Sequence, residues 1–523
     1  MDAILIHSGV KAHVLSMAWP EGIDPLSLSD FESRARRNRY RMLAQLAVRN
    51  GIRGFFLGHH QDDQVETILM RMIRTEHPTS FALQGMIDMS SMPYCDDIWG
   101  VHSEQRTLLV EQVVSQSMER QTLPSYSRFL KTMPPSNTPI NTLDGKIRIP
   151  GGSMIGLYRP LLGFSKASLV ETCKQNSVPY IVDPTNADPK LTMRNAVRHL
   201  RNTTILPRAL GSERILQLRR RSVRRVEETL RAGEDLARSA RILSMDLRSG
   251  TAVIRLPDTI PALLGSSPAM VGNALSRILR LVSPIAHDES SSILSEAMLA
   301  HLQQSGALLG PRAGHVVPEA QRGSPYVRVT AMNKVLIEAS HQHLNGDLWE
   351  TTWQISRQPM REAESEAMEN SFELIQKSTL PRLSEQEDDT VLPRTMSEHQ
   401  RRKSMPWSKH VFWDNRYWMR VQTQETANLQ AFAVRPYCKD DVPSVEARLK
   451  KHDMAVWRSF SSIVSNTARG KIRYTLPVIT HNHEVCAFPS LGIRIPCRNG
   501  KYNSLLVDFE VTYKKIGEPF AKT

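Results

Sequence analysis

The chain has 523 residues, of which 40% are hydrophobic, and this length suits roughly three domains with cores of their own. No run of about 18 apolar residues occurs, which excludes a conventional membrane-spanning helix. Lysine and arginine total 67 against 53 acidic residues, a formal net charge of +14. This excess favours a polyanionic partner, nucleic acid first and an anionic membrane surface second.

The cysteines and the first residues of the chain limit the cellular setting. Five cysteines are scattered with no CxxC pair, which argues against a disulfide framework and against a zinc or iron–sulfur cluster. A reducing compartment is therefore expected. The opening stretch "MDAILIHSGVKAHVLSMAW" has the features of neither a secretory signal nor a mitochondrial presequence.

The first predicted elements alternate between strand and helix. Residues 12 to 19 are predicted as a strand and residues 30 to 49 as a helix, with Asp30 as N-cap candidate and Gly51 after its end. "FFLGHH" (55–60) follows as a short buried strand, and residues 63 to 74 form the next helix. This order predicts an α/β fold with a parallel Rossmann-like sheet.

A polar stretch interrupts that pattern between residue 88 and about residue 150, and it is predicted as a partly disordered insertion in a first domain of residues 1 to 210. Beyond it, residues 165 to 175 are predicted as a helix and "PYIVD" (179–183) as a strand. Another helix is expected from Thr192 onward.

The rest of the chain is predicted to contain three further regions. A strongly basic helix over 212–243 opens a mainly helical region, 211–350, and residues 351 to 407 are predicted as a disordered linker. Residues 408 to 523 are expected to form a small β-rich domain. Its Trp413, Tyr417 and Trp418 could stack on nucleic-acid bases or pack in a core.

Residues 59 to 66, "HHQDDQVE", form the densest polar cluster where a strand passes into a helix. Ligands of open α/β sheets bind at this edge. Asp62 or Asp63 with Glu66, one helical turn apart, could hold a cationic ammonium group or a magnesium ion, and His59 could meet a phosphate or move a proton. Alternatively, the acidic residues simply cap the helix and complement its dipole.

A second cluster, "VDPTNADPKLTMRNAVR" (182–198), combines turn-forming residues with a basic helix start. Asp183 and Asn186 lie beside prolines, as turn residues do. Arg194 and Arg198 share a helix face that would suit a phosphate. The alternative is a turn followed by a solvated basic face.

Taken in order, several segments resemble the tRNA(Ile)-lysidine synthetase family of N-type ATP pyrophosphatases, the PP-loop superfamily. The segments are "ESRARRNRYRML", "LGHHQDDQVETILMRMIR", "FALQGM", "YRPLLGFSKASLVETC" and "PYIVDPTNADPKLTMRNAVRHLR". The match covers roughly residues 12 to 210 apart from the insertion. The resemblance implies an adenine nucleotide alpha hydrolase-like sheet, a helical region and a C-terminal tRNA-binding domain.

The resemblance also implies a reaction. ATP activates C2 of the wobble cytidine of an isoleucine tRNA with a CAU anticodon, and the ε-amine of free lysine displaces AMP to give lysidine. Asp63 and Glu66 would hold the lysine ammonium, while His59 and Asp62 would face the ATP phosphates or Mg²⁺. The tRNA or phosphate candidates are Arg36, Arg39, Arg194, Arg198, Arg219, Arg220 and Arg224.

One departure from the family bears on activity. The family's ATP site begins with an SGGxDS loop that cradles pyrophosphate, whereas this chain has only "HSGV" (7–10). The sheet is therefore expected to be incomplete, and unaided catalysis is not expected. Three explanations are open: missing upstream sequence, a short form without catalysis, or a first half supplied by another polypeptide.

Two alternative functions stay open, a non-catalytic tRNA-binding protein and a tRNA thiolation enzyme of the same ATPase superfamily. The missing CxxC pairs count against thiolation. A eukaryotic version would be expected in mitochondria and a bacterial one in the cytoplasm.

Overall fold

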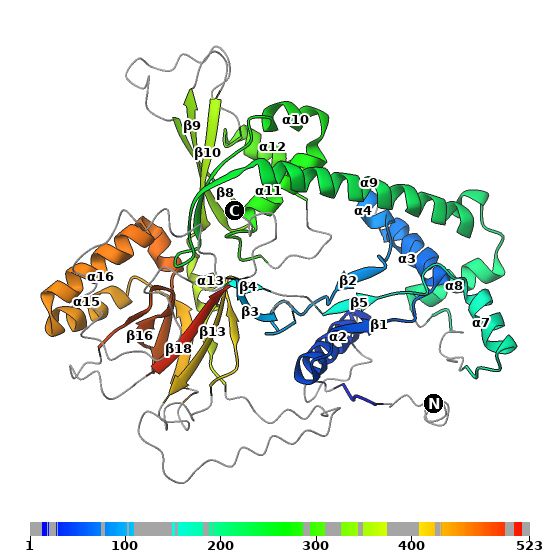
Figure 1. Ribbon diagram of the computed structural model, residues 1–523, viewed down its shortest axis with the longest axis horizontal. Helices are drawn as coiled ribbons and strands as arrows, with labels where there is room; N and C mark the ends of the chain where they lie inside the picture. Colours follow the sequence, from blue (N-terminus) through cyan, green and yellow to red (C-terminus); the bar gives the residue numbers. More distant parts are fainter. Residues whose placement is uncertain are drawn as a thin grey trace, which may run out of the picture. The chain divides into compact units, whose positions relative to one another are not determined.

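The computed structural model describes the chain in segments (Figure 1). The described residues are 13–17, 19, 28, 30–74, 79–101, 104–108, 149–151, 155–180, 188–190, 192–285, 293–308, 326–343, 349–373, 407–423, 429, 431–496 and 507–514. They fall into two compact units. The first comprises mainly residues 1–101 and 153–231, and the second mainly residues 232–379 and 385–523. Among the described residues, no helix is long and apolar enough to cross a membrane.

The first unit begins with a helix packed beside a small mixed sheet. Helix α2 (Phe31–Asn50) ends at Gly51, whose φ of 66° permits the left-handed cap. Strands β1 (Gly54–Phe56) and β5 (Gly156–Tyr158) pair in parallel, and β2 (Met89–Ser91) is antiparallel to β5. The buried side chains of Tyr40, Ala44 and Leu157 share one hydrophobic cluster, so α2 and the sheet form one layer pair.

Helices α3 (Gln61–Arg74), α4 (Ser80–Leu83), α8 (Met193–Thr203) and the start of α9 (Ser212–Ser239) share a second hydrophobic cluster. Helix α7 (Lys166–Gln175) contributes no buried residue to it. Ser165 and Thr192 cap α7 and α8, because each hydroxyl accepts the amide N–H three residues on. Ile68 of α3, Val197 of α8 and Ile215 of α9 pack together.

The sequence predictions for this unit need five corrections. Residues 13–17 and 19 form no strand, Tyr180 is not in one either, and the last residues of "PYIVD" lie outside the described part. The sheet is mixed rather than parallel. The insertion does not begin at residue 88, because β2 joins the sheet and Met92 and Cys95 are buried. Asp30 makes no cap hydrogen bond; its carboxylate accepts from the Arg34 side chain instead.

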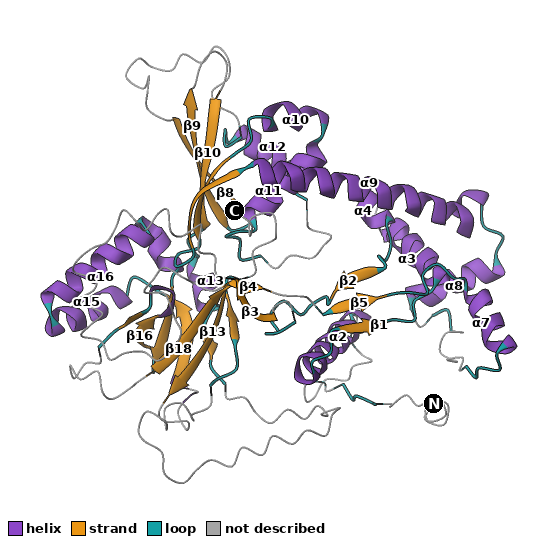
Figure 2. Ribbon diagram, viewed as in Figure 1, coloured by secondary structure: helices purple, strands orange, loops and turns teal. Residues whose placement is uncertain are grey.

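The second unit opens with a five-stranded antiparallel sheet in the order β6-β7-β10-β9-β8. Figure 2 labels β8, β9 and β10 of this sheet. Its strands are Arg241–Asp246, Thr251–Arg255, Trp349–Arg357, Val335–His343 and Tyr326–Met332, in that spatial order. Helices α10 (Ile260–Ser266), α11 (Pro268–Leu279) and α12 (Glu296–Gln304) contribute apolar side chains to the same core.

The described residues of the second unit form three more sheets. One has the order β11-β14-β15-β16-β17, with strands Asn370–Ser371, Phe432–Pro436, Pro477–His481, Glu484–Phe488 and Ile493–Arg494. Another, β12-β13-β18, has strands Val411–Trp413, Tyr417–Thr423 and Val507–Tyr513. Three helices belong to this part, α13 (Glu362–Glu366), α15 (Asp441–His452) and α16 (Met454–Thr467). A further two-stranded pair joins β3 (Glu104–Leu108) to β4 (Ile149–Gly151).

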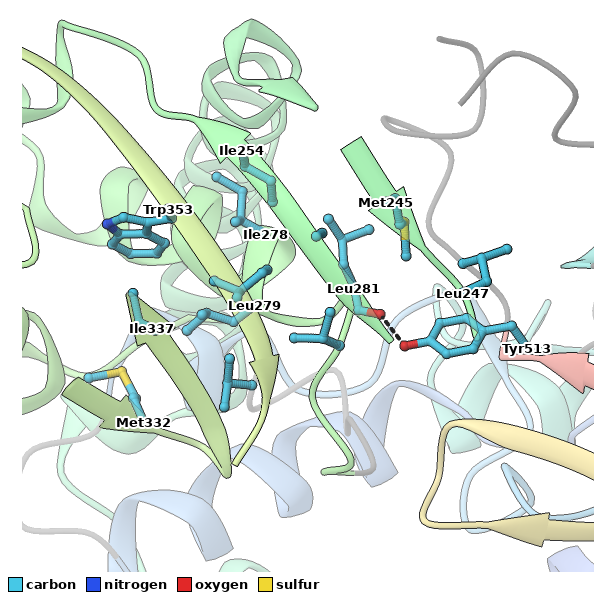
Figure 3. Packing of buried hydrophobic residues seen from close by; sticks show 14 of the residues in the cluster. Met245, Leu247, Ile254, Ile278, Leu279, Leu281, Met332, Ile337, Trp353 and Tyr513 are labelled. Atoms are coloured by element: carbon cyan, nitrogen blue, oxygen red, sulfur yellow. Dashed lines mark hydrogen bonds between the residues drawn. The ribbon is translucent and has the colours of Figure 1, made fainter. Parts of the chain in front are cut away.

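Strands far apart in sequence share the core of the second unit. Figure 3 shows Tyr513 of β18 among Met245, Leu247 and Leu281, and its hydroxyl donates to the Leu281 carbonyl at 2.9 Å. Trp353 of β10 is also fully buried and lies in the same cluster. The first sheet and β18 therefore fold as parts of one core.

The structure moves three predicted boundaries. The basic helix α9 ends at Ser239 and not at residue 243, because β6 begins at Arg241. The region predicted as mainly helical contains the five-stranded sheet. Order extends to residue 373, through β10, α13 and β11, so the predicted linker begins too early, and residues 374–406 lie outside the described part.

A buried ion-pair cluster ties this second unit together. The Asp414 carboxylate, 2% exposed, accepts from Arg416 Nε at 2.7 Å and from Arg357 Nε at 3.2 Å. Arg416 also donates to the carbonyls of Ser249 and Thr475. Asp414 is thus shared by two buried guanidinium groups, and Glu364 gives Arg357 a second counter-charge at 2.7 Å.

We expect Asp414→Asn to lower the free energy of unfolding of this unit by about 3 kcal/mol, because two buried guanidinium groups lose their shared counter-charge. Asparagine tolerates the positive φ of 50° at this position, so backbone strain does not contribute. Urea unfolding followed by tryptophan fluorescence measures the change. Asp235→Asn, at a site 67% exposed in a surface pair, should leave the transition where it is; an equal loss in both variants would contradict the assigned role.

Candidate functional site where α3 meets α8

The turn from β1 into α3 is closed by a reciprocal cap. The His60 amide donates to Asp63 Oδ2 at 3.0 Å, and the Asp63 amide lies 3.4 Å from His60 Nδ1. This is the capping-box geometry with histidine as the N-cap. The capping interpretation of the 59–66 cluster is therefore confirmed, and it occupies only one of the two Asp63 carboxylate oxygens.

Asp62, the neighbouring acid, joins three helices. Its Oδ2 accepts the Lys166 amide N–H at the start of α7 at 2.8 Å, and its Oδ1 accepts from Arg201 at 3.2 Å. Burial alone would raise the pKa of Asp62, but the Lys166 amide and the Arg201 guanidinium hold that pKa below its usual value. Asp62 is therefore ionised at neutral pH.

Glu66 forms the best-defined ion pair of the site. Its side chain is 1% exposed, and Arg198 binds it in a bidentate way, with Nε to Oε1 at 2.8 Å and Nη2 to Oε2 at 2.9 Å. The hydrogen bonds to Glu66 raise the pKa of Arg198. Both carboxylate oxygens of Glu66 are thus committed to α8.

Asp63 is held less tightly by the same helix. Its Oδ1 lies 3.6 Å from Arg198 Nη2 and 3.8 Å from Arg194 Nη1, beyond hydrogen-bond length. The Asp63 side chain is 12% exposed. Of the three acids on α3, Asp63 therefore has the carboxylate oxygen most open to a new cationic partner.

His59 is a neutral imidazole in this setting. Burial lowers its pKa to about 4; Asp63 opposes the shift, while Arg159, Arg194 and Arg36 add to it. The buried Nδ1 atom has no hydrogen-bond partner among the described residues. One nitrogen of this neutral ring is thus both buried and without a partner in the described part of the chain.

The predicted arginines of α2 and α9 differ in their surroundings. Arg36 and Arg39 both lie over the ring of Tyr40, with 5.2 Å and 5.9 Å to the centroid. On α9, Arg220 and Arg224 are exposed. Arg219 instead donates to the Met86 carbonyl at 3.0 Å, and burial lowers its pKa, so its side chain serves the packing of α9.

Three predicted aromatic contacts turn out to be core residues. Trp413 and Tyr417 are fully buried, and Trp418 is 7% exposed. The core alternative is therefore the correct one for these side chains. The predicted segments around residues 7–10, Asp183 and Asn186 lie outside the described residues.

The donor set does not fit a resident Mg²⁺ at Asp62. A hard dication needs several free oxygen ligands, whereas both Asp62 oxygens already accept hydrogen bonds and Arg201 lies 3.2 Å from one of them. Within the described part of the chain, no group of three or more His, Cys, Asp or Glu side chains is arranged to hold a metal.

Sequence reasoning missed two arginines of this site. Arg201 binds Asp62 and Ser212, and Arg159, 7% exposed, donates to the Ile87 carbonyl and to Ser90. The spacing of Arg194, Arg198 and Arg201 at i, i+4 and i+7 could have indicated a shared face for all three. Arg159 follows no such spacing, but it lies in the segment "YRPLL" that carries the family resemblance, and this was a signal for it.

Comparisons with known proteins identify a domain family and several relatives. A family described as the PP-loop domain matches residues 8–105 and 136–205. The chain is 24% identical over 474 residues to a protein of Schizosaccharomyces pombe named probable tRNA(Ile)-lysidine synthase, an alignment that covers 90% of this chain and 75% of the relative.

Bacterial proteins named tRNA(Ile)-lysidine synthase match shorter stretches. The protein of Chlamydia trachomatis serovar L2 is 47% identical over 58 residues, 11% of this chain and 18% of the relative. That of Polaromonas naphthalenivorans is 26% identical over 251 residues, 48% of this chain and 53% of the relative. The chain thus spans about half or less of the length of these two relatives.

The match over residues 8–105 and 136–205 assigns this part of the chain to the PP-loop domain, a class of ATP-binding domain. Proteins named tRNA(Ile)-lysidine synthase resemble the chain beyond that domain, since one of them aligns with 90% of its length at 24% identity.

Removing Arg198 tests the buried pair. Arg198→Met should lower the unfolding free energy of the first unit by about 3–5 kcal/mol, because Glu66 is left buried without its main counter-charge. Adding Glu66→Gln should restore most of the loss, since the double variant buries no unpaired charge. Urea unfolding measures both. Asp30→Asn, in an exposed pair with Arg34, is the control and should be silent; a double variant no better than Arg198→Met would contradict the pairing.

His59 should make stability depend on pH in a defined window. Its folded pKa of about 4 lies below the ordinary 6.5, so the unfolded state binds the proton more tightly and stability falls as the pH drops from 6.5 toward 4. In His59→Gln this part of the pH dependence should disappear. Thermal melting at pH 7, 5.5 and 4.5 measures it, and an unchanged pH profile would argue against a buried neutral imidazole.

Proposed function

We propose that this protein modifies tRNA by ligating lysine, at the expense of ATP, to C2 of the wobble cytidine of an isoleucine tRNA with a CAU anticodon. Similarity to proteins named tRNA(Ile)-lysidine synthase supports the reaction class, and the ATP-binding class of domain supports the nucleotide. The proposal assigns the reaction centre to the start of α3.

The observation that carries the proposal is the meeting of two distant polar motifs. The cluster at 59–66 and the arginines of α8 are separated by 132 positions at the Arg198–Glu66 contact. Both motifs belong to the family resemblance, and neither alone offers both a cation site and an anion site. Together they offer a carboxylate for an ammonium group beside guanidinium groups for phosphates.

The reaction divides into two balanced steps. The C2 oxygen of the cytidine attacks the α-phosphorus of ATP, and pyrophosphate leaves. The lysine ammonium group first gives a proton to a base or to water. The neutral ε-amine then attacks C2, the bond from C2 to the adenylate oxygen breaks, and AMP leaves with that electron pair. The attached nitrogen then loses a second proton to a base or to water. Holding the amine beside C2 makes the second step effectively unimolecular.

Asp63 is the residue that we assign to the lysine ammonium. Its Oδ1 has only long arginine contacts, of 3.6 Å and 3.8 Å, so a lysine can replace them without breaking a good hydrogen bond. Glu66, committed to Arg198, contributes negative charge behind Asp63 and fixes the arginine. Of the two acids predicted to hold the lysine ammonium group, Asp63 would therefore contact it and Glu66 would support the site.

The cations around His59 supply the other half of the site. Arg194, Arg198 and Arg36 are our candidates for the ATP phosphates, with the neutral His59 ring as a hydrogen-bond partner. Arg39, and Arg220 and Arg224 on the exposed face of α9, are the candidates for the tRNA backbone, where contacts of this kind set affinity and its salt dependence.

A second candidate function is tRNA binding without ligation. The exposed arginines of α9 favour it, because they need no intact ATP site to act. Lysine incorporation and tRNA affinity, measured on the same preparation, discriminate the two candidates.

Asp63→Asn should abolish incorporation of labelled lysine into tRNA, because the variant loses the negative charge that binds the lysine ammonium group. The affinity for tRNA should stay within about twofold, because Asp63 is not assigned a contact with tRNA. The asparagine oxygen can still accept the His60 amide, so the cap survives. Incorporation is measured with ATP and tRNA of CAU anticodon, and affinity by filter binding at fixed salt.

Asp30→Asn, which lies in an exposed pair, serves as the matched charge control and should behave as wild type. Full incorporation by Asp63→Asn would remove Asp63 from the site. Wild-type protein that binds tRNA but never incorporates lysine would favour the second candidate.

A further inference from the structure

Arg201 is the arginine of α8 that faces the site but carries none of the roles assigned above. It lies one turn beyond Arg198 on the same helix face, and its side chain is 14% exposed. Arg194 and Arg198 are 28% and 20% exposed. Arg201 is thus the least accessible of the three, which makes a direct contact with substrate the least suitable role for it.

Its guanidinium joins three helices. Nη2 donates to Asp62 Oδ1 of α3 at 3.2 Å and to the Ser212 hydroxyl at the start of α9 at 3.0 Å. Nη1 lies 3.7 Å from Glu66 Oε1. A planar fork with fixed donor directions suits several partners at once, which a lysine ammonium cannot reproduce.

The contact reaches a fourth helix through Asp62. The second oxygen of that carboxylate accepts the Lys166 amide at the first residue of α7, and the Gln61 amide donates to the Phe164 carbonyl just before it at 2.9 Å. Two helix N-termini therefore meet at one carboxylate, an arrangement that negative charge stabilises.

Helix α7 depends on such polar contacts more than its neighbours do. None of its residues from Lys166 to Gln175 is buried, whereas α3 and α8 both contribute to a hydrophobic cluster. An element with little buried apolar surface opens locally at low cost. The start of α7 is therefore held at the site largely by the hydrogen bond to Asp62 and by the Gln61–Phe164 hydrogen bond.

We propose that Arg201 is a positioning residue, which orients the Asp62 carboxylate and, through it, holds the start of α7 against the reaction centre. That this reaction centre ligates lysine rests on the function proposed above. That Arg201 holds the start of α7 in place does not depend on that function. Arg201 acts through Asp62, so the effects of the two residues are coupled.

Hydrogen–deuterium exchange tests the ordering without any activity. In Arg201→Gln, amides in a peptide covering 161–175 should exchange about tenfold faster or more, the factor expected for loss of one charge-assisted hydrogen bond. A peptide from α2 should be unchanged. Arg201→Lys keeps the charge without the fork and should fall between the two.

Arg214→Gln is the matched control, because Arg214 lies on the first turns of α9, is exposed, and bonds only to Gln217 in the described structure. It should leave exchange in α7 at the wild-type rate. Exchange in α7 that is equally slow in Arg201→Gln and in wild type would overturn the proposal, as would equal acceleration by Arg214→Gln.

A double-mutant cycle on activity tests the route through Asp62. Arg201→Gln should lower kcat about tenfold or more with little change in tRNA affinity, and adding Asp62→Asn should lower it little further. If the double variant lowers kcat by the product of the two single-variant factors, the two residues act independently, and the coupling is overturned. If wild-type protein incorporates no lysine, the proposed function is rejected. If α7 nevertheless exchanges faster in Arg201→Gln than in wild type, the positioning role of Arg201 stands.

Discussion

The bidentate contact between Arg198 and Glu66 is the interaction on which the site of the first unit depends. Glu66 is 1% exposed, and an unpaired carboxylate at that depth would be strongly destabilising. The pair therefore fixes the alignment of α8 against α3. Once Arg198 is placed, helix periodicity brings Arg194 toward Asp63 and Arg201 toward Asp62. One contact thus sets the positions of six charged side chains.

Helix capping and chemistry are compatible in this site, because they use different atoms of the same residue. Asp63 closes the start of α3 with one oxygen and turns the other toward the arginines. A helix start is suited to both tasks, since its free N–H groups require acceptors and its dipole favours negative charge. The two interpretations of the 59–66 cluster were therefore not exclusive.

The sequence predicted what depends on local signals. Helix α2 with its Gly51 cap, and the Thr192 start of α8, follow from periodicity and capping residues. It could not predict the Glu66–Arg198 pair, because nothing local reports a contact over 132 positions. Trp413 and Tyr417 were ambiguous since aromatic residues in strands suit cores and ligands alike, and tertiary packing decided. Residues 349–357 form a strand beside a charged stretch whose composition suggested disorder.

The charge balance at the site separates it from the rest of the molecule. Three carboxylates face three guanidinium groups there, so the cluster contributes almost nothing to the long-range field of a chain that carries +14. That field comes from side chains such as the exposed arginines of α9, and salt screens it over about 8–10 Å. An approaching polyanion would be attracted by the exposed arginines and not by the charge-balanced cluster between α3 and α8. Ionic strength therefore controls encounter, while the geometry of the centre is largely insulated from it.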